Sequence, residues 1–345
     1  MLVLSLAAEA AARVANFGLE GVLHAGRYQF EKFFDSELMG TTDDPLLPYG
    51  LRADVDTYYN GGTFRTNAHG FRGRDVSEQK PAGVVRVVVL GSSYSLGQGV
   101  DQEDTYPAQL ERLLNESLPG RYEVLNLAVP NHRLPEMLRV YETTARRFDP
   151  DLILVEFYDD YLRGYRDLLP QPFPLPAERT VRHVARQHSF AYTAARRFAS
   201  SHGLGAWSSR ISERHRRTSP GRPARYRAAG VARETGCDAI ARLVATERDR
   251  GGDVVLVRLA RLNELDGRGH LAPATERCCR SVTDCRVIET VDRVRAGASS
   301  SDAVFYGNNH PNARMTRLYA EAIYEQLTAI LTAPYVELAG AGGPG

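Results

Sequence analysis

The chain has 345 residues, of which 43% are hydrophobic and 25% charged, a composition ordinary for a soluble globular protein with a full core. Its 43 Lys and Arg residues nearly balance its 42 Asp and Glu residues, which excludes a global field favouring nucleic acid or an anionic membrane. The four cysteines are too few for a disulfide framework in a chain of this length and lack the spacing of a zinc site. We therefore expect free thiols in a reducing compartment, and no metal or other cofactor.

The first 80 residues predict a helix followed by a loop-rich segment. Residues 1–13 begin apolar without a basic segment ahead of them, and Glu9 and Arg13 interrupt the run at helical spacing. Because the run is too short for a signal peptide or a membrane span, we expect an amphipathic helix packed on the main domain of a cytoplasmic protein. Residues 40–80 are rich in Gly, Asp, Asn and Pro, which predicts a loop apron over one end of a sheet.

Strands and helices then alternate. In chain order, the sequence predicts a strand, a helix, a strand, a helix and a strand at residues 84–90, 104–118, 122–129, 134–148 and 152–158. Asp104 is expected to cap the first of these helices, with Pro107 in its first turn.

Residues 161–233 interrupt this alternation. They are rich in Arg, Pro and Ser, which predicts a partly helical insertion and a candidate lid. A helix, two strands and a helix follow at residues 237–250, 254–259, 286–289 and 314–331. Residues 336–345 are predicted to be a disordered tail. We therefore expect one three-layer α/β domain over residues 81–335, with a five-stranded parallel sheet, helices on both faces and ligands at the carboxyl ends of the strands.

The turn after the first predicted strand, Gly91-Ser-Ser-Tyr-Ser-Leu-Gly-Gln-Gly-Val100, admits several interpretations. A phosphate-binding P-loop is excluded because Gln98 stands where a lysine is required. The glycines of a dinucleotide fingerprint come six residues late, and Ser95 occupies the final glycine of an α/β-hydrolase elbow. What remains is a serine at the carboxyl end of a strand, either a nucleophile or a small residue that a tight turn requires.

Residues 86–100 closely resemble the nucleophile block of the SGNH (GDSL-type) hydrolases. The resemblance continues in order over most of the chain, the insertion excepted, through the motifs Thr66–Gly73, Asp104–Leu110, Val124–Pro130, Asp149–Val155 and His310–Asn312. It implies the SGNH/flavodoxin-like form of the three-layer fold. It also implies a Ser-His pair that acts on an ester or acyl group of a small molecule.

The resemblance assigns roles to individual residues. Ser93 matches the nucleophile and His310 the base, while Ser92 replaces the aspartate that the family has beside the nucleophile. Asn131 stands where the family has an oxyanion-hole glycine, and Asp159-Asp160 stand where it has Asn-Asp.

Two of these positions depart from the family in their chemistry. Asn308 and Asn309 replace the aspartate that precedes the histidine, so we expect Asn308, Asn309 or a backbone carbonyl to orient the imidazole, and not Asp302. An ionised Asp159 would repel an oxyanion. Acyl transfer therefore requires Asp159 to be protonated, turned away or paired with a cation such as Arg163 or Arg166.

Three functions are compatible with these residues. The first is a serine hydrolase or acyltransferase that uses Ser93 and His310, and the retention of both residues favours it. The second is an inactive SGNH-like protein whose pocket binds a ligand. The third is repurposed chemistry with Asp159 or Asp160 as general acid or base. We expect a small-molecule ester or acyl substrate, no nucleic-acid partner and no stable membrane anchor; substrate identity and oligomeric state do not follow from the sequence.

Overall fold

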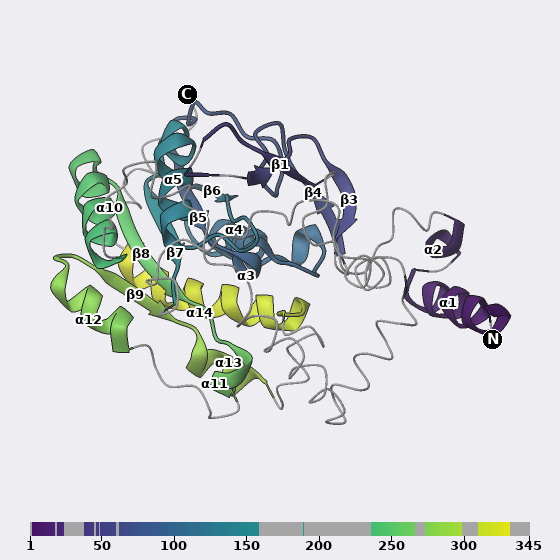
Figure 1. Cartoon of the computed structure of the whole chain (residues 1–345). Helices are drawn as coiled ribbons and strands as arrows, with labels where there is room; N and C mark the ends of the chain where they lie inside the picture. Colours follow the sequence, from purple (N-terminus) through teal and green to yellow (C-terminus); the bar gives the residue numbers. More distant parts are fainter. Residues whose placement is uncertain are drawn as a thin grey trace, which may run out of the picture.

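The computed structural model describes residues 2–17, 19–23, 38–44, 46–47, 49–59, 62–158, 189, 236–265, 273–298 and 310–331. Figure 1 shows the elements that these residues form, and its labels are used below.

A five-stranded parallel sheet forms the core of the molecule (Figure 1). Its strand order is β6-β5-β7-β8-β9. The strands are β5 (Val84–Leu90), β6 (Arg121–Asn126), β7 (Leu152–Glu156), β8 (Asp253–Arg258) and β9 (Arg286–Glu289). Strands β5 and β7 are buried along their whole length, as expected for parallel strands with helices on both faces. The predicted five-stranded parallel sheet is confirmed.

Helices cover both faces of this sheet (Figure 1). On one face α4 (Tyr106–Ser117) packs against α14 (Ala313–Leu331), and on the other α5 (Leu134–Thr143) packs against α10 (Gly236–Arg250). The predicted three-layer α/β fold is therefore confirmed. The shorter helices are α3 (Ser93–Leu96), η1 (Gln102–Asp104), η2 (Ala145–Phe148), α11 (Leu262–Leu265), α12 (Pro273–Ser281) and α13 (Val291–Gly297).

Two of the predicted helices differ from the structure by more than one residue at a boundary. Thr105, and not Asp104, caps α4: its side chain accepts the N–H of Ala108 at 3.4 Å, while Asp104 belongs to the preceding 3₁₀ turn. The helix predicted over residues 134–148 ends at Thr143, and η2 continues it after a break.

Two antiparallel hairpins precede the sheet. Strand β1 (Met39–Thr41) pairs with β2 (Tyr49–Leu51), and β3 (Asp56–Tyr59) pairs with β4 (Gly62–Arg65). Their apolar side chains form a small core with Leu96 of α3 and with Ala128 and Val129, which follow β6. The loop apron predicted from composition thus contains hairpins, and it packs on the loops at the carboxyl ends of β5 and β6.

The N-terminal helices α1 (Leu2–Phe17) and α2 (Glu20–Leu23) contact each other and lie apart from the sheet in Figure 1. Leu6 of α1 and Leu23 of α2 are exposed by 62% and 71%, and Leu19, between the two helices, by 72%. Packing of the first helix on the main domain therefore stays a prediction. Within the described ranges, no helix combines the length and the apolar character that crossing a membrane requires.

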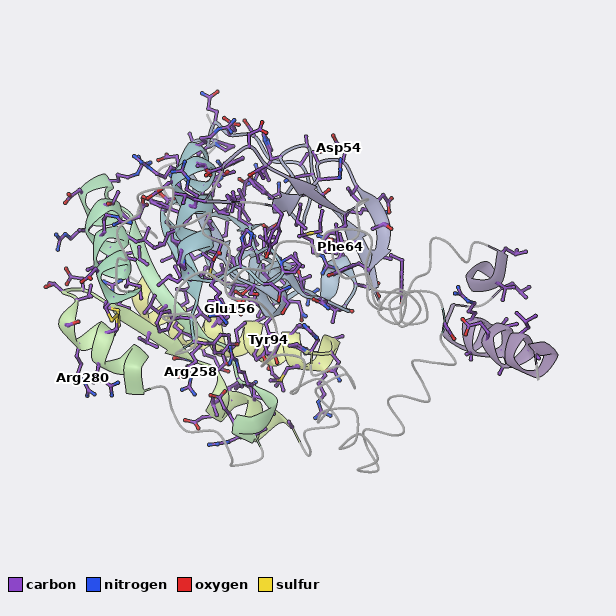
Figure 2. The ribbon with its side chains drawn as sticks, in the orientation of Figure 1. Asp54, Phe64, Tyr94, Glu156, Arg258 and Arg280 are labelled. Atoms are coloured by element: carbon purple, nitrogen blue, oxygen red, sulfur yellow. A yellow bond between two sulfur atoms is a disulfide. The ribbon has the colours of Figure 1, made fainter. Side chains whose placement is uncertain are left out.

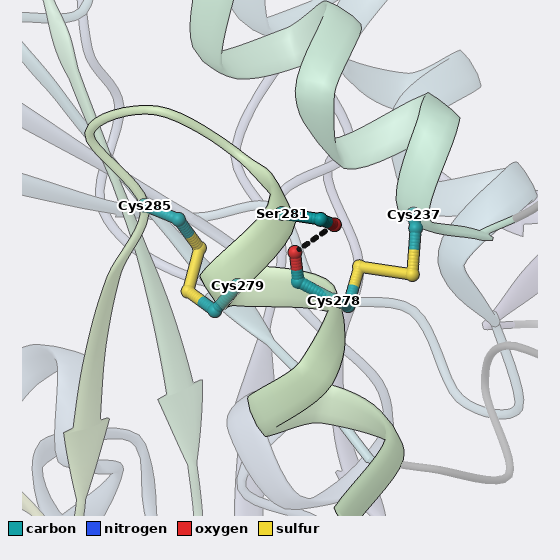
Figure 3. Close-up of a disulfide and its surroundings, with 5 residues drawn as sticks. All are labelled: Cys237, Cys278, Cys279, Ser281 and Cys285. Carbon is teal, nitrogen blue, oxygen red and sulfur yellow. Dashed lines mark hydrogen bonds between the residues drawn. A yellow bond between two sulfur atoms is a disulfide. The ribbon is translucent and has the colours of Figure 1, made fainter.

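All four cysteines are paired in two disulfides, so the expectation of free thiols is wrong (Figure 3). Cys237 of α10 bonds Cys278 of α12, and Cys279 bonds Cys285 ahead of β9. Consecutive residues on a helix point in different directions, so the adjacent Cys278 and Cys279 have different partners. Since disulfides persist mainly in oxidising compartments, the prediction of a cytoplasmic location loses the support of the cysteines.

The strand order places a switch point between β5 and β7. The chain passes from β5 to β6 on one side and then crosses to β7 on the other. Sheets of this order bind ligands at such a point, beyond the carboxyl ends of the two strands. Ser93 follows β5 directly, so the candidate nucleophile lies there.

Candidate active site

Ser92 and Ser93 lie where β5 turns into α3. The turn requires glycine at position 91, because a Cβ there would lie 2.4 Å from Ser95 Oγ and 2.8 Å from Glu156 Oε2. Ser92 is buried, whereas Ser93 is partly exposed. Of the two serines, Ser93 is thus the more accessible to a ligand.

A buried carboxylate fixes this turn by accepting hydrogen bonds from two of its backbone N–H groups. Glu156 is the last residue of β7 and is 1% exposed. Its Oε2 accepts the backbone N–H of Ser92 at 2.8 Å and that of Ser95 at 3.1 Å. Glu156 lies close to Tyr94 in Figure 2. The sequence analysis missed Glu156, although a charged residue inside an apolar run at the end of a strand was a visible signal.

His310 precedes α14 at the same edge of the sheet. Asn312 caps α14, since its Oδ1 accepts the N–H of Met315 at 3.0 Å, and Pro311 lies outside the helix. The rings of His310 and Tyr94 are in edge contact, with centroids 5.8 Å apart and planes at 62°. Because Tyr94 follows Ser93 directly, the fold brings the candidate base to the turn of the candidate nucleophile.

Ser93 and His310 both belong to the described part of the chain, and no direct hydrogen bond joins the Ser93 hydroxyl to the His310 imidazole there. Such bonds are often long in enzymes without substrate and shorten only in the complex. The contact between Tyr94 and His310 is therefore the geometric link between the two residues.

Two tyrosines bring α4 and α14 to the serine turn. The Tyr106 hydroxyl of α4 lies 3.1 Å from Ser95 Oγ. The Tyr319 hydroxyl of α14 donates to the backbone carbonyl of Ala260, which follows β8. The two tyrosine rings are in edge contact, with centroids 6.4 Å apart. Both helices are thus fixed close to the carboxyl ends of the strands.

Asn131 follows β6 and adopts a left-handed backbone conformation, with φ of 63°. Glycine adopts this conformation freely, and asparagine is one of the few other residues that tolerate it. The backbone at this position thus suits the glycine that the resemblance places here, and it explains why asparagine in particular can replace that glycine.

His132 comes next and is buried in the contact with the hairpins. Its Nε2 lies 3.3 Å from the carbonyl oxygen of Tyr49, and its Nδ1 has no hydrogen-bond partner within the described ranges. Burial lowers the pKa of His132 from 6.5 to about 4. Burial raises the pKa of the nearby Glu136 to about 7.

We expect His132 to make the stability of the protein depend on pH. Between pH 4 and 6.5 its imidazole binds a proton in the unfolded chain but not in the folded one. Its contribution is therefore fully present above pH 6.5 and is lost as the pH falls towards 4. The difference between the two pKa values corresponds to about 3 kcal/mol.

Urea unfolding of the wild type and of His132→Gln between pH 4 and 7 checks this expectation. The glutamine amide can still donate to the carbonyl of Tyr49. Glu136 acts in the opposite direction over the same range, but it is present in both proteins and cancels in the difference. Between pH 7 and pH 4 the free energy of unfolding should fall by about 3 kcal/mol more in the wild type than in the variant. An equal fall in both proteins would contradict the prediction.

A cation also lies at this edge of the sheet. The guanidinium carbon of Arg261, which follows β8, lies 3.4 Å from the centroid of the Tyr158 ring. The Tyr158 hydroxyl donates to the carbonyl of Leu259 at 3.0 Å, and the Tyr158 ring is in edge contact with Tyr94. Arg261 thus places positive charge beside the residue that precedes Asp159. The sequence analysis considered other arginines for this role.

Arg72 joins the hairpins to the end of α3. Its buried guanidinium donates to four backbone carbonyls at 2.6–2.9 Å and to one side-chain oxygen at 3.2 Å, and it lies 4.5 Å over the Phe64 ring. The acceptors belong to Thr63, Leu96, Gly97, Val100 and Gln102. Burial lowers the pKa of Arg72 to about 9, so it stays charged at neutral pH. The sequence analysis quoted Arg72 only as part of a motif.

Several predicted site residues lie outside the described residues, and their roles stay predictions. They are Asp159, Asp160, Arg163, Arg166, Asp302, Asn308 and Asn309. Among the residues that the structure does describe, no group of three or more His, Cys, Asp or Glu side chains could hold a metal ion.

No family model matches the sequence, and no curated protein matches it. The folded chain is similar to a putative lipolytic protein of the G-D-S-L family from Desulfitobacterium hafniense DCB-2, at 10% identity and a TM-score of 0.40 over 70% of this chain and 98% of that one. It is also similar to the lipase/acylhydrolase from Enterococcus faecalis, at 11% identity and a TM-score of 0.39 over 71% and 96% of the two chains. A third similar structure is the esterase EstA from Pseudoalteromonas sp., at 13% identity and a TM-score of 0.39 over 72% and 99%.

The family named for the first of these structures is the one that the sequence motifs resemble. Likenesses with TM-scores of about 0.4 carry no argument about activity.

Proposed function

We propose that the protein is a serine hydrolase or acyltransferase of the SGNH type that acts on an ester or acyl group of a small molecule. Ser93 is the nucleophile and His310 the base. The observation that carries this proposal is the ring contact of His310 with Tyr94, beside Ser93, at the switch point of the sheet. The contact joins residues 216 positions apart along the chain, on two elements that the sequence motifs had singled out separately.

The chemistry follows from these two groups. His310 takes the hydroxyl proton as Ser93 Oγ bonds to the carbonyl carbon of the substrate. The tetrahedral intermediate collapses, and the leaving alkoxide takes the proton from His310, which leaves an acyl group on Ser93. Water or an acceptor hydroxyl then gives its proton to His310 and attacks the acyl group. As this second intermediate collapses, Ser93 Oγ leaves and takes the proton from His310, which releases an acid or a new ester and restores both groups.

The donors for the oxyanion have to be groups other than Asp159, because this carboxylate stands where the family has an amide. The side chain of Asn131 is one candidate donor, because an amide supplies an N–H that a glycine side chain lacks. Arg261 supplies positive charge at the same edge of the sheet. These two groups support an oxyanion site despite the acidic residue.

Imidazole rescue tests the proposal. His310→Ala should lower kcat for an activated short-chain ester about 10³-fold, because the serine loses its base. Added imidazole should restore part of that loss, since it can occupy the space of the missing ring. His69→Ala, which removes a half-buried histidine of the apron, serves as the matched control and should keep kcat within about twofold. A His310→Ala protein with unchanged kcat would contradict the proposal.

Asp159→Asn provides a second prediction. An ionised carboxylate and a developing oxyanion a few ångströms apart disfavour each other, whereas an amide of similar size donates a hydrogen bond. The variant should therefore hydrolyse an activated ester about tenfold faster, which corresponds to an activation barrier lower by about 1.4 kcal/mol. Steady-state kinetics measures the rate change, and Asp160→Asn, measured in the same way, serves as the comparison. Loss of activity in Asp159→Asn would instead make Asp159 a catalytic acid or base and favour the repurposed chemistry.

A further inference from the structure

Glu156 is a buried acid that accepts hydrogen bonds from the serine turn. Its Oε2 bonds the N–H of the residue before Ser93 and that of Ser95, from the neighbouring strand β7. Asn126 of β6 holds the same turn from the other side, because its Nδ2 donates to the carbonyl of Ser95 at 2.9 Å. Two strands that flank β5 therefore fix the backbone on either side of Ser93.

These contacts do not use the N–H of Ser93. The first N–H groups of a helix have no partner within the helix. In α3, Leu96 donates to the carbonyl of Ser92 at 2.8 Å and Ser95 donates to Glu156. The N–H of Ser93 has no hydrogen-bond acceptor within the described part of the chain. An N–H on the nucleophile itself can donate to the oxyanion only if the turn keeps a fixed orientation.

We propose that Glu156 is a positioning residue. It fixes the serine turn so that the hydroxyl of Ser93 can attack the substrate carbonyl carbon while the N–H of Ser93 donates to the oxygen of the same carbonyl group. This inference rests on the proposed function. The carboxylate is a rigid acceptor, because Glu156 is the last residue of a buried strand and a single oxygen accepts both backbone N–H groups. Bonds from amides to a carboxylate are stronger than those to a neutral acceptor.

The charge of Glu156 also reaches the site. Burial is the main reason that the pKa of Tyr94 is raised, and the negative charge of Glu156 adds to it. Arg261 acts on the same hydroxyl in the opposite direction, and Glu264 in the same direction as Glu156. Since the Tyr94 ring contacts His310, the charge of Glu156 should favour the protonated form of His310.

Two substitutions separate position from charge. Glu156→Gln keeps an oxygen acceptor for the two amides and removes the charge, whereas Glu156→Ala removes both. We expect Glu156→Ala to lower kcat about 10²-fold with KM within about twofold, because the misplaced groups act mainly in the transition state. Glu156→Gln should keep kcat within about fivefold, and the acid limb of its kcat/KM profile should move to lower pH, because the negative charge near His310 is gone.

Glu123→Gln is the matched control. Glu123 is a buried carboxylate on β6, bonded to Arg86 at 2.7 Å near the opposite end of the strands. Its substitution should lower the melting temperature and leave kcat and the pH profile unchanged. Equal loss of kcat in Glu123→Gln and Glu156→Ala would show a general effect of destabilisation and overturn the inference, as would wild-type kcat in Glu156→Ala.

Amide hydrogen exchange gives a readout that does not depend on turnover. Exchange over residues 91–98 should rise at least tenfold in Glu156→Ala but not in Glu123→Gln. Unchanged exchange would overturn the positioning role even if kcat falls. If exchange rises while the turnover of the wild type proves independent of Ser93, the proposed function fails and the fixing of the turn by Glu156 stands.

Discussion

Ser93→Ala should lower kcat for an activated ester by about 10⁴-fold or more, since it removes the hydroxyl that forms the proposed acyl-enzyme. Ser93 follows β5, lies partly exposed at the start of α3 and precedes the tyrosine that contacts His310. Steady-state and single-turnover kinetics measure the loss. The melting temperature should change little, because the site is a partly exposed hydroxyl.

Ser92→Ala is the control that the chain itself offers. Ser92 is the adjacent serine of the same turn, but it is buried, and its N–H bonds Glu156 through the backbone, which alanine keeps. Its substitution should keep kcat within about tenfold. If Ser92→Ala were inactive and Ser93→Ala active, the assignment of the two serines would be reversed; if both were active, the nucleophile would lie elsewhere.

Arg72→Met should lower the free energy of unfolding by about 3–5 kcal/mol. The guanidinium is buried and satisfies carbonyl oxygens on β4, on α3 and on the turn that follows α3. Methionine fills much of the volume but leaves these carbonyls without donors. Arg72→Lys should lower the free energy of unfolding by somewhat less, because an ammonium group keeps three donors for these carbonyls. It does not restore the wild-type value, because it lacks the five donors and the planar fork of a guanidinium.

Urea unfolding of these variants against Arg65→Met checks the expectation. Arg65 lies in the same hairpin, but its side chain is exposed and pairs with Asp56 at 3.3 Å on the surface. Such pairs contribute at most about 1 kcal/mol. A similar loss in Arg72→Met and Arg65→Met would show that the buried guanidinium does not hold the hairpins to α3.

The sheet could be predicted because its signals are local. Residues 84–90 and 286–289 are strands in the structure with the predicted bounds, since each is a run with strong strand propensity next to a turn. The cap of α4 was wrong by one residue because Asp104 and Thr105 are both good caps, and the following contacts decide between them. The hairpin of β3 and β4 was missed although Asn60-Gly61 is a strong hairpin signal between the two strands.

Site residues could be predicted from the sequence only where they belong to a recognisable motif. Ser93 and His310 stood out by resemblance, whereas Glu156 and Arg72 act through contacts with elements far away in the sequence. The disulfide between Cys237 and Cys278 joins helices 41 residues apart, a pairing that depends on how α10 and α12 pack. Spacing alone contains no information about such contacts.

Mapping the adduct of a fluorophosphonate probe by mass spectrometry tests the central claim most directly. The probe forms a covalent bond only with a serine that a base activates. The wild type should carry one adduct, on Ser93, and His310→Ala should react at least about 10²-fold more slowly. Absence of an adduct, an adduct on another serine, or an unchanged rate in His310→Ala would contradict the assignment of Ser93 and His310 as nucleophile and base.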